Sequence, residues 1–568
     1  MKKLYSTLAL ILCLVMVAFC FASCDKGKKG KTTAPDTATE TGTSTEAPPD
    51  KWESIAREVN GISPSNRSFL ISYDKYSSAE RKAKNDEYIQ GPDEVVEGQT
   101  SAIQQMVYWR NHNAADLLGL DVSYTTMDKD WNSQCDEIVM LVSGNAADAP
   151  DLFINMVFDL NIALKTQGVF RDIKDLPGSY FDFDSKKGWM ASWMESYSFT
   201  GDRAYILASD YFLDVMRAMG VLPFNMDLMN ARAADLAPVI LEEGETLETG
   251  EDLTDRFFDF VELGHWTWDT LAKLCDAVFQ DTDNSGTNTV QDTLGIMTDG
   301  YSGMPAALIV FSTGESLTET VTDENGHTTG ILLKENATTV GEIFDAVKGV
   351  FGGRGAFVSV GGADGATEDK PGIAYSQIKF SENTLLFAGP TLLGALENEA
   401  FQNMTYTYSV VPLPKVDVNK DYNTIVHNTA DVGAINVHTN PQKANVISAY
   451  LQHCTENSGD IREEFLQIVT KYRTTTYNQG TSRMLDLIYD KLANSRDKAI
   501  EDASMRKEGA RFHGVMKDHG FVWGSSDVIS WYESNRSTKQ SKIDDLLGIW
   551  FNLPTNAAAN ANTEPAAE

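Results

Sequence analysis

Cysteine is scarce in this 568-residue chain, which contains only six. Two lie in the N-terminal leader and a third, Cys24, closes it, so Cys135, Cys275 and Cys454 remain. Their odd number and wide spacing argue against a disulfide framework. Each lies among apolar residues at regular spacing. We therefore predict three buried, small hydrophobic side chains rather than reactive thiols.

Positive charge is also in short supply, with 47 Lys and Arg against 81 Asp and Glu and a net charge of −34. A surface of this sign repels a phosphate backbone, so we expect no nucleic-acid partner. The chain lacks the Gly-x-Ser-x-Gly elbow, the His-Glu-x-x-His motif, the P-loop and Cys-x-x-Cys. We therefore expect no enzyme and no catalytic cofactor. A glycosidase-type pair of carboxylates is the alternative that the many acidic residues leave open.

The N-terminus has the features of a lipoprotein signal peptide. Lys2 and Lys3 precede an apolar run from Leu8 to Ala22, which is too short to span a bilayer comfortably. The run ends in Phe-Ala-Ser-Cys24, which resembles a lipobox. We predict that residues 1–23 are removed and that the Cys24 thiol receives diacylglycerol, which tethers the chain to the extracellular face of the cell membrane. The alternative is an ordinary secretory signal with a chance cysteine.

The segments at the two ends of the mature chain lack apolar clusters. Residues 24–50 contain seven threonines and three prolines, and residues 554–568 are rich in Ala and Asn. Such segments bury too little surface to fold. We predict a flexible tether at 24–50 and a disordered tail at 554–568. The roughly 500 residues between them are enough for two or three domains.

Strand and helix patterns alternate along this central region. Apolar and polar periodicity predicts strands at 67–73, 120–124 and 149–155, with helices at 101–118 and 132–143 between them. This order predicts an α/β fold with parallel strands and crossover connections. The second half repeats the style, with helices beginning at Thr267 and Pro441, a helix at 341–351 and a short strand at 384–387.

Several short stretches occur in an order that resembles one protein family. They are Ala149-Pro-Asp-Leu-Phe-Ile-Asn, Gln167-Gly-Val-Phe-Arg-Asp-Ile, Gly201-Asp-Arg-Ala-Tyr, Leu222-Pro-Phe-Asn-Met-Asp, Trp266-Thr-Trp-Asp-Thr-Leu, Leu386-Phe-Ala-Gly-Pro and Tyr408-Ser-Val-Val-Pro-Leu-Pro-Lys. Together they resemble the extracellular solute-binding proteins of ABC importers, in the sugar-binding family that includes maltose-binding protein. The match is collinear over roughly residues 66–455.

The resemblance implies a two-lobed fold of the periplasmic-binding-protein type II, in which each lobe is a mixed or parallel sheet flanked by helices. Residues 51–208 with 433–490 would form one lobe, and 209–432 with 491–553 the other. The chain would cross between them near 209–215 and 425–435. A ligand bound in the cleft would close the lobes by a hinge motion.

The resemblance implies that the protein captures a carbohydrate, which we expect to be an oligosaccharide. It would then deliver this ligand to the transmembrane subunits of an ABC permease. We expect a monomer. Two alternatives stay open at this point. One is a cell-surface glycan-binding or sensory lipoprotein without a permease, and the other is a surface glycoside hydrolase.

A sugar site requires polar side chains for the hydroxyls beside aromatic rings for the apolar faces. Polar and aromatic residues occur together in five places. These are the segment after the third predicted strand, a polar loop that contains two tryptophans, the two chain crossings and the C-terminal region. In the family a Trp often follows Gly-Pro and stacks on the sugar, whereas this chain has Thr391 there. The predicted ligand residues are Asn155, Phe158, Asp159, Trp189, Trp193, Asp210, Tyr211, Thr391, His427 and Trp523. The competing interpretation of each is a packing role.

The loop from Asp281 to Asp292 has the spacing of a calcium-binding loop. Oxygen-bearing side chains fall at positions 1, 3 and 5, with a glycine at position 6 and a carboxylate at position 12. The predicted ligands of a structural Ca²⁺ are Asp281, Asp283, Ser285, Thr287 and Asp292. The alternative is a solvated loop that satisfies its own hydrogen bonds.

Overall fold

The computed structural model describes residues 50–556 with thirteen internal gaps. The gaps are 76–83, 131–132, 145–148, 166–167, 186–187, 301–302, 360–374, 399–400, 402, 472–478, 494, 505–511 and 520. The predicted signal peptide, Cys24, almost all of the predicted tether and residues 557–568 of the predicted tail lie outside the described residues. Within the described part, no helix combines the length and apolarity needed to cross a bilayer.

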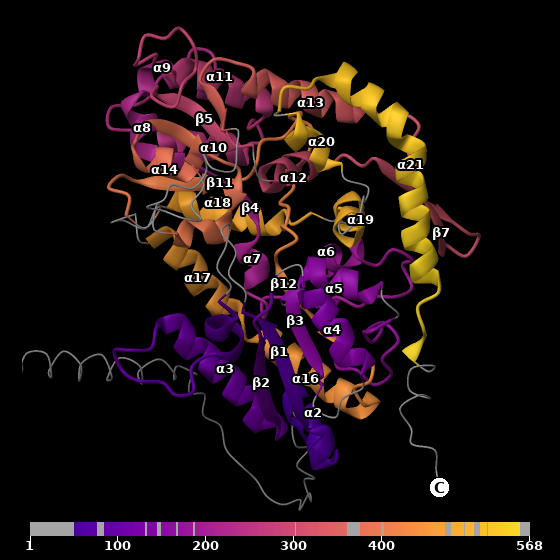
Figure 1. The fold of residues 1–568 in the computed structure, drawn as a ribbon. Coiled ribbons are helices and arrows are strands. Elements are labelled where there is room, and N and C mark those ends of the chain that lie inside the picture. The colour runs from indigo at the N-terminus through magenta and orange to yellow at the C-terminus, as the bar shows by residue number, and fades with distance from the viewer. Residues whose placement is uncertain are drawn as a thin grey trace, which may run out of the picture. The chain divides into compact units, whose positions relative to one another are not determined.

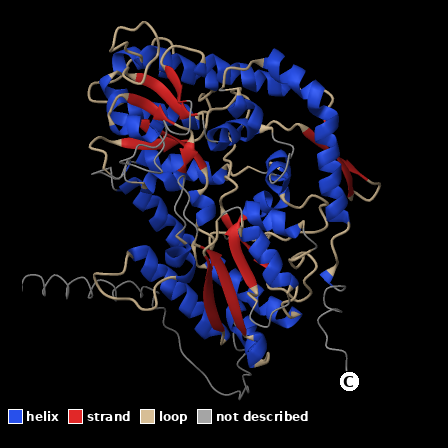
Figure 2. Ribbon diagram, viewed as in Figure 1, coloured by secondary structure: helices blue, strands red, loops and turns tan. Residues whose placement is uncertain are grey.

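The first sheet has four strands in the order β12-β3-β1-β2. β1 pairs in parallel with β2 and β3, while β12 runs antiparallel to β3. Helices flank this sheet (Figures 1 and 2), and α16 packs against β1 and α3. The elements are β1 Ser68–Asp74, β2 Asp121–Met127, β3 Leu152–Met156, β12 Asp431–Ile435, η1 Pro64–Asn66, η2 Asp86–Gln90, α2 Lys51–Asn60, α3 Ala102–Leu118, α4 Gln134–Ser143, α5 Val157–Leu164, α6 Ala191–Ser196, α16 Pro441–Glu456 and α17 Gly459–Lys471.

The second sheet contains β10, β4, β9, β5 and β8 in that order, and β11 also pairs with β4. β5 is parallel to β8 and β9, whereas β4 is antiparallel to its partners. The elements are β4 Gly220–Asn225, β5 Leu294–Asp299, β8 Ala356–Ser359, β9 Leu385–Ala388, β10 Thr391–Leu392, β11 Tyr408–Val411, η3 Leu393–Glu397, α8 Met226–Ala231, α9 Ala233–Ile240, α10 Leu253–Glu262, α11 Trp268–Val278, α12 Gly303–Ser312, α13 Thr338–Phe351, α14 Tyr375–Ser381 and α18 Gln479–Asp490. The predicted α/β class with parallel and mixed sheets is confirmed.

Three predicted helix starts are confirmed by their capping bonds. The Ser101 hydroxyl accepts from the Gln104 amide, and Thr267 accepts from Thr270 in the same way. Asn440 accepts from the amide of Gln442, with Pro441 in the first turn. Side-chain oxygens at these positions satisfy amides that have no partner inside the helix.

The predicted burial of the three cysteines is also confirmed. Trp266 and Trp268 are almost completely buried. Cys135, Cys275 and Cys454 are free and buried. Burial raises the pKa of the Cys454 thiol to about 12, so this group is protonated at neutral pH.

Two antiparallel segments connect the sheets. Leu207 pairs with Gly433 and Met219 with Val426. Between these pairs, the His427 amide donates to the Ala218 carbonyl at 2.9 Å. The segments run from β3 towards β4 and from β11 back to β12, where the resemblance placed the chain crossings. The lobe boundaries themselves stay a prediction. They assign the helix α18 to the lobe of the first sheet, but it packs against β11 and α10, which belong to the predicted second lobe.

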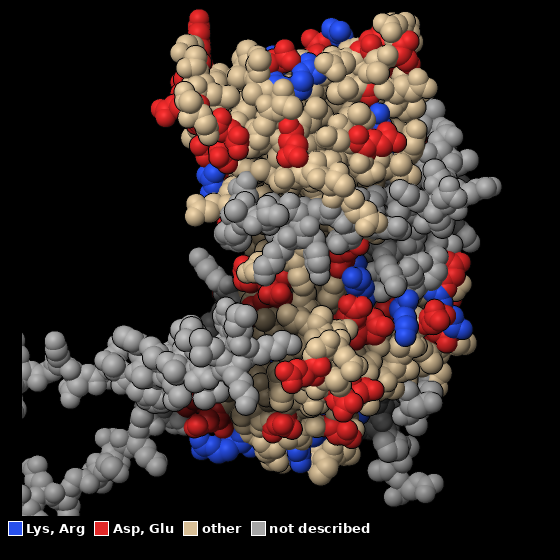
Figure 3. All heavy atoms as spheres, turned by 90° about the vertical axis from the view of Figure 1, so that its left-hand side faces the viewer, with Lys and Arg blue, Asp and Glu red and all other residues tan. Residues whose placement is uncertain are grey.

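The remaining elements belong to neither of the two larger sheets. They are α7 Asp214–Arg217 in the first crossing, the hairpin β6 Thr318–Thr322 and β7 Thr328–Leu333, α19 Arg496–Ser504, α20 His513–Asp518 and α21 Ser525–Phe551. On the face drawn in Figure 3, acidic side chains are spread widely and basic ones are sparse, in line with the net charge.

Candidate functional site

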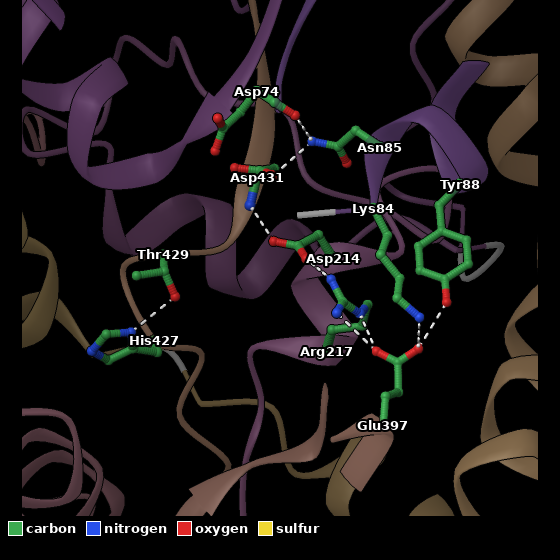
Figure 4. A network of polar contacts seen from close by, with 10 residues as sticks. All are labelled: Asp74, Lys84, Asn85, Tyr88, Asp214, Arg217, Glu397, His427, Thr429 and Asp431. Carbon is green, nitrogen blue, oxygen red and sulfur yellow. Dashed lines mark hydrogen bonds and ion pairs between the residues drawn. The ribbon is translucent and has the colours of Figure 1, made fainter. Parts of the chain in front are cut away.

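A buried polar cluster lies where the strands of the first sheet end (Figure 4). Asp74 closes β1 and Asp431 opens the antiparallel β12, so both lie at the same edge. Asn85 joins them, because its Nδ2 donates to Asp431 Oδ2 at 2.7 Å and to the Asp74 carbonyl at 3.0 Å. The carboxyl ends of strands are where open α/β sheets bind ligands. We call the ten residues of Figure 4 the strand-end cluster.

Arg217 extends the strand-end cluster into the first crossing. The short helix α7 places Arg217 three residues after Asp214, and Nη1 donates to Asp214 Oδ1 at 2.7 Å. The other Asp214 oxygen accepts from the Asp431 amide at 2.9 Å. Both side chains are only 2% exposed. This ion pair therefore ties the crossing helix to the edge of the first sheet.

Glu397 completes the strand-end cluster from the second sheet. It ends η3, which follows β10, and its Oε2 accepts from Arg217 Nε at 2.8 Å. Its Oε1 accepts from Lys84 Nζ and from the Tyr88 hydroxyl, each at 2.9 Å. Figure 4 shows Lys84 and Tyr88 pointing at this carboxylate from η2 and the residues before it. One carboxylate thus bonds to donors from the crossing helix and from the first-sheet side.

The charges around Glu397 hold one another ionised. Burial by itself would raise the pKa of Glu397, but Arg217 and Lys84 bring it below its usual value. Burial would lower the pKa of Arg217, yet Glu397 and Asp214 bring it above its usual value.

The close approach of η3 to α7 depends on Gly394. A Cβ at this position would lie 3.0 Å from Arg217 Cβ, so a larger residue would push the two elements apart.

The predicted residues Asp210 and Tyr211 precede α7 in the first crossing. Asp210 accepts from Arg462 Nη1 at 3.0 Å and from the Tyr489 hydroxyl at 2.8 Å. Burial raises the pKa of Asp210, although these two donors act in the opposite direction. Tyr211 is completely buried, with the Arg110 guanidinium carbon 4.4 Å from its ring centre.

Three predicted residues lie at the end of β3 and the start of α5. Asn155 Nδ2 donates to Gln134 Oε1 at 2.7 Å. The Phe158 amide donates to the Asn428 carbonyl at 3.2 Å, which joins α5 to the second crossing. Asp159 is completely buried. The structure therefore brings Phe158 against the second crossing, which carries His427, and Asn155 pairs with Val432 on β12, while Asp159 lies one residue after Phe158 on α5.

The predicted aromatic residues are packed into the protein. Trp189 donates from Nε1 to Gln452 Oε1 at 2.8 Å and meets the ring edges of Phe181 and Phe183. Trp193 packs against Tyr197 with 4.9 Å between ring centres. Ser209, beside Asp210, forms a bridge with Trp189, so this loop adjoins the first crossing.

Three predicted residues lie further along the chain. His427 is half-buried, and its Nδ1 lies 3.0 Å from the Thr429 hydroxyl. Thr391 pairs with Val221 on β4 and accepts from Gln377 Nε2 at 3.2 Å. Trp523 lies between α20 and α21, where it stacks on His519 with 3.6 Å between ring centres. The structure places Trp523 with these two helices and not with the strand-end cluster.

Sequence reasoning missed the ion pairs of the strand-end cluster. Lys84, Arg217 and Glu397 are separated by more than a hundred residues from one another, so no local pattern links them. One signal was available, because Asp214 and Arg217 are the only charges between Tyr211 and Phe224. Opposite charges three residues apart in an apolar run are typical of a buried pair.

The predicted calcium loop brings three carboxylates together. Oxygens of Asp281, Asp283 and Asp292 lie within 4.8 Å of one another. The Ser285 amide donates to Asp281 at 3.1 Å and to Asp283 at 2.9 Å. The turn needs a positive φ of 73° at Gly286. Convergent hard oxygens are the donor set that Ca²⁺ prefers, so these residues fit the ion.

An open groove of about 470 Å³ lies elsewhere, between the end of α5 and the end of α21. It is lined by Lys165, Asp544, Asp545, Gly548, Ile549, Asn552, Leu553 and Pro554. None of the predicted ligand residues lines it.

The sequence matches no protein-family model and no curated protein. Several solved structures are similar to the chain. The galacto-N-biose/lacto-N-biose I-binding protein of an ABC transporter from Bifidobacterium longum has a TM-score of 0.44 and 12% identity, with 85% of this chain and 97% of that one covered. An ABC transporter associated binding protein from B. animalis subsp. lactis, bound to β-1,6-galactobiose, has a TM-score of 0.44 and 11% identity, with coverages of 84% and 98%.

A family 1 extracellular solute-binding protein from Bifidobacterium longum subsp. infantis has a TM-score of 0.41 and 12% identity, with coverages of 86% and 99%. Two of these three proteins are binding proteins of ABC transporters, and the third is a family 1 extracellular solute-binding protein.

Proposed function

We propose that this chain is a lipid-anchored extracellular solute-binding protein that captures a carbohydrate and delivers it to an ABC permease. The observation that carries the proposal is the pair of antiparallel crossing segments between two α/β sheets, joined by the Leu207–Gly433 and Met219–Val426 pairs. Two thin crossings between two sheets are the architecture in which a ligand-linked hinge motion operates.

The polar residues gathered at the crossings support this proposal. Asn155, Asp210 and His427 lie at or beside the strand ends of the first sheet. Amide, carboxylate and imidazole groups are the partners that sugar hydroxyls require. A carbohydrate, which has many hydroxyls and no charge, suits such a set better than an anionic solute, because the chain is strongly acidic.

The anchor and the permease follow from the N-terminal sequence and from the resemblance. A diacylated Cys24 would hold the binding protein at the membrane, and a tether of about 25 residues would let it reorient there. The closed, ligand-bound form is then the species that a permease recognises. No covalent bond is made or broken in this cycle.

A ligand screen tests the proposal. The purified chain is heated with sugars, peptides, polyamines or amino acids, and unfolding is followed by fluorescence. A sugar at 100 times its Kd is expected to stabilise the folded form by about 2.7 kcal/mol. A response to peptides or polyamines alone would refute the carbohydrate assignment.

Two histidine variants give the screen a matched control. We expect His427→Ala, at the second crossing, to abolish the response to the sugar. His327 lies on the exposed turn between β6 and β7, and its side chain is 67% exposed. The variant His327→Ala should therefore respond to the sugar like the parent. Equal responses of both variants would remove His427 from the site.

We also propose that the loop from Asp281 to Asp292 binds a structural Ca²⁺. The convergence of three carboxylates supports this proposal, because their oxygens are the hard ligands that Ca²⁺ prefers. EDTA is therefore expected to lower the melting temperature, and calorimetry should detect Ca²⁺ binding.

The variant Asp283→Asn is expected to weaken that binding at least tenfold. Its control is Asp323→Asn, since Asp323 accepts from two amides in another exposed turn but belongs to no group of three converging ligands among the described residues. Calorimetry with no heat for the parent chain would dispose of the calcium proposal.

A further inference from the structure

The long helix α21 is attached at its start to the second-sheet side of the protein. The Ser525 amide donates to Asp345 Oδ1 on α13 at 2.7 Å. Gly341 lets the two helices touch, because a Cβ there would lie 2.8 Å from Ser525 Cβ. α13 packs in turn on α11 and β8. The start of α21 is therefore fixed to the helical layer of the second sheet.

The middle of α21 is attached to the hairpin strand β7. The side-chain amide of Gln540 makes two hydrogen bonds to the backbone of β7. Its Oε1 accepts from the Leu333 backbone N–H at 2.8 Å, and its Nε2 donates to the Ile331 carbonyl at 2.9 Å. The Tyr532 hydroxyl donates to the Lys334 carbonyl at 2.6 Å. In Figure 1 the helix runs alongside this hairpin.

The end of α21 is attached to the first-sheet side. Trp550 is 1% exposed and meets the rings of Phe199 and Tyr205 at 4.8 and 5.3 Å. Beyond the helix, Asn556 Oδ1 accepts from the Asp172 amide at 3.0 Å, and Nδ2 donates to the Asp172 carbonyl at 2.8 Å. The neighbouring Arg171 amide donates to the Ile435 carbonyl of β12. The contact is thus continuous with the first sheet.

These contacts make α21 a further connection between the two sheets, in addition to the two crossing segments. Its 27 residues span about 40 Å at 1.5 Å per residue. A continuous helix of this length bends far less readily than the two crossing segments, whose only helix is the four-residue α7. Attachment at both ends therefore restricts changes in the separation of the sheets.

We propose that α21 is a strut that limits the hinge motion between the first-sheet and second-sheet layers. The proposal rests on the proposed function, because the motion that it restricts is the one that ligand binding drives. The strut holds the ligand-free chain in a narrow range of separations. Ligand-induced closure is then a small adjustment about the fixed ends of α21 rather than a free swing.

A proline in the middle of α21 tests the strut. Ser537 is exposed, so Ser537→Pro breaks the helix while both ends keep their contacts. A kink of about 20° would displace the end of the helix, about 20 Å further on, by about 7 Å. Ser537→Ala is the matched control, because alanine is compatible with a straight helix.

The readout is the distance between two spin labels in the ligand-free chain from Asp25 onward. The labels are attached at Asn113→Cys on α3 and Lys273→Cys on α11, both exposed, while Cys135, Cys275 and Cys454 are buried. We expect the parent and Ser537→Ala to give one narrow distribution. Ser537→Pro is expected to broaden or shift it by several ångströms.

A second variant covers the case in which Ser537→Pro does not fold. Trp550→Ala removes the ring contacts of the end of α21 with Phe199 and Tyr205 without breaking the helix, and it should broaden the distribution in the same way. An unchanged distribution in folded Trp550→Ala or folded Ser537→Pro overturns the strut. Because the distances are measured without ligand, this result is independent of the sugar screen, whose failure would refute the proposed function alone.

Discussion

Replacing Arg217 by methionine is expected to lower the free energy of unfolding by about 3–5 kcal/mol. The guanidinium is 2% exposed and bonds to the carboxylates of Asp214 and Glu397. Methionine has a similar length but no charge, so both carboxylates would keep their buried positions without this cation. Leaving buried charges uncompensated is among the most destabilising single changes. Equilibrium unfolding in urea measures the difference.

Arg256→Met is the matched control for this prediction. Arg256 also contacts two carboxylates, those of Glu245 and Glu251, but its side chain is 32% exposed. Exposed pairs contribute about 0–1 kcal/mol, so this variant should unfold close to the parent. If both variants lost the same free energy of unfolding, burial of the Arg217 ion pairs would not contribute to stability as predicted.

A double variant separates the ion pair from general packing. Glu397→Gln removes one of the two carboxylates that Arg217→Met leaves behind. Arg217→Met with Glu397→Gln should therefore be more stable than the sum of the two single losses predicts. Strict additivity would mean that Arg217 and Glu397 do not stabilise each other, contrary to their distance of 2.8 Å.

Cys24→Ala is expected to abolish membrane attachment. Two acyl chains contribute on the order of 10 kcal/mol or more to membrane binding, since each buried CH₂ adds about 0.8 kcal/mol. The parent chain should incorporate a labelled lipid precursor and sediment with membranes. The variant should incorporate none and leave the membrane fraction.

Cys20→Ala serves as the control for the anchor, because Cys20 lies only four residues upstream in the same leader. This variant should be lipidated and retained like the parent. Label in Cys24→Ala would instead show that another residue carries the lipid. Loss of label in both variants would indicate damage to the leader rather than loss of the acceptor thiol.

Much of the fold could be predicted because it depends on short stretches of sequence. β1, α3 and β3 follow from periodicity over a few residues, and Ser101, Thr267 and Asn440 mark helix starts through bonds to amides two or three residues away. The buried state of Cys275 follows in the same way from its apolar neighbours Leu271, Leu274 and Val278. The predicted calcium loop is local too, and its carboxylates do converge.

The candidate site was predicted less completely, because its contacts link distant parts of the chain. Asp210 and His427 were placed at the crossings from motif order alone. The partner of Asp210, Arg462, could not be chosen, since this hydrogen bond depends on where two segments 252 residues apart meet in space. The packing of Trp189 on Gln452 was invisible for the same reason.

By itself, the sequence determined the α/β class and the helix starts, and it predicts the lipobox with its tether, because each depends on residues that are neighbours along the chain. Only the tertiary structure decided that Lys84, Arg217 and Glu397 form one buried cluster and that α21 spans both sheets. These contacts join residues more than a hundred positions apart. These contacts stabilise the protein only when both sheets are folded. No local sequence pattern can therefore predict them.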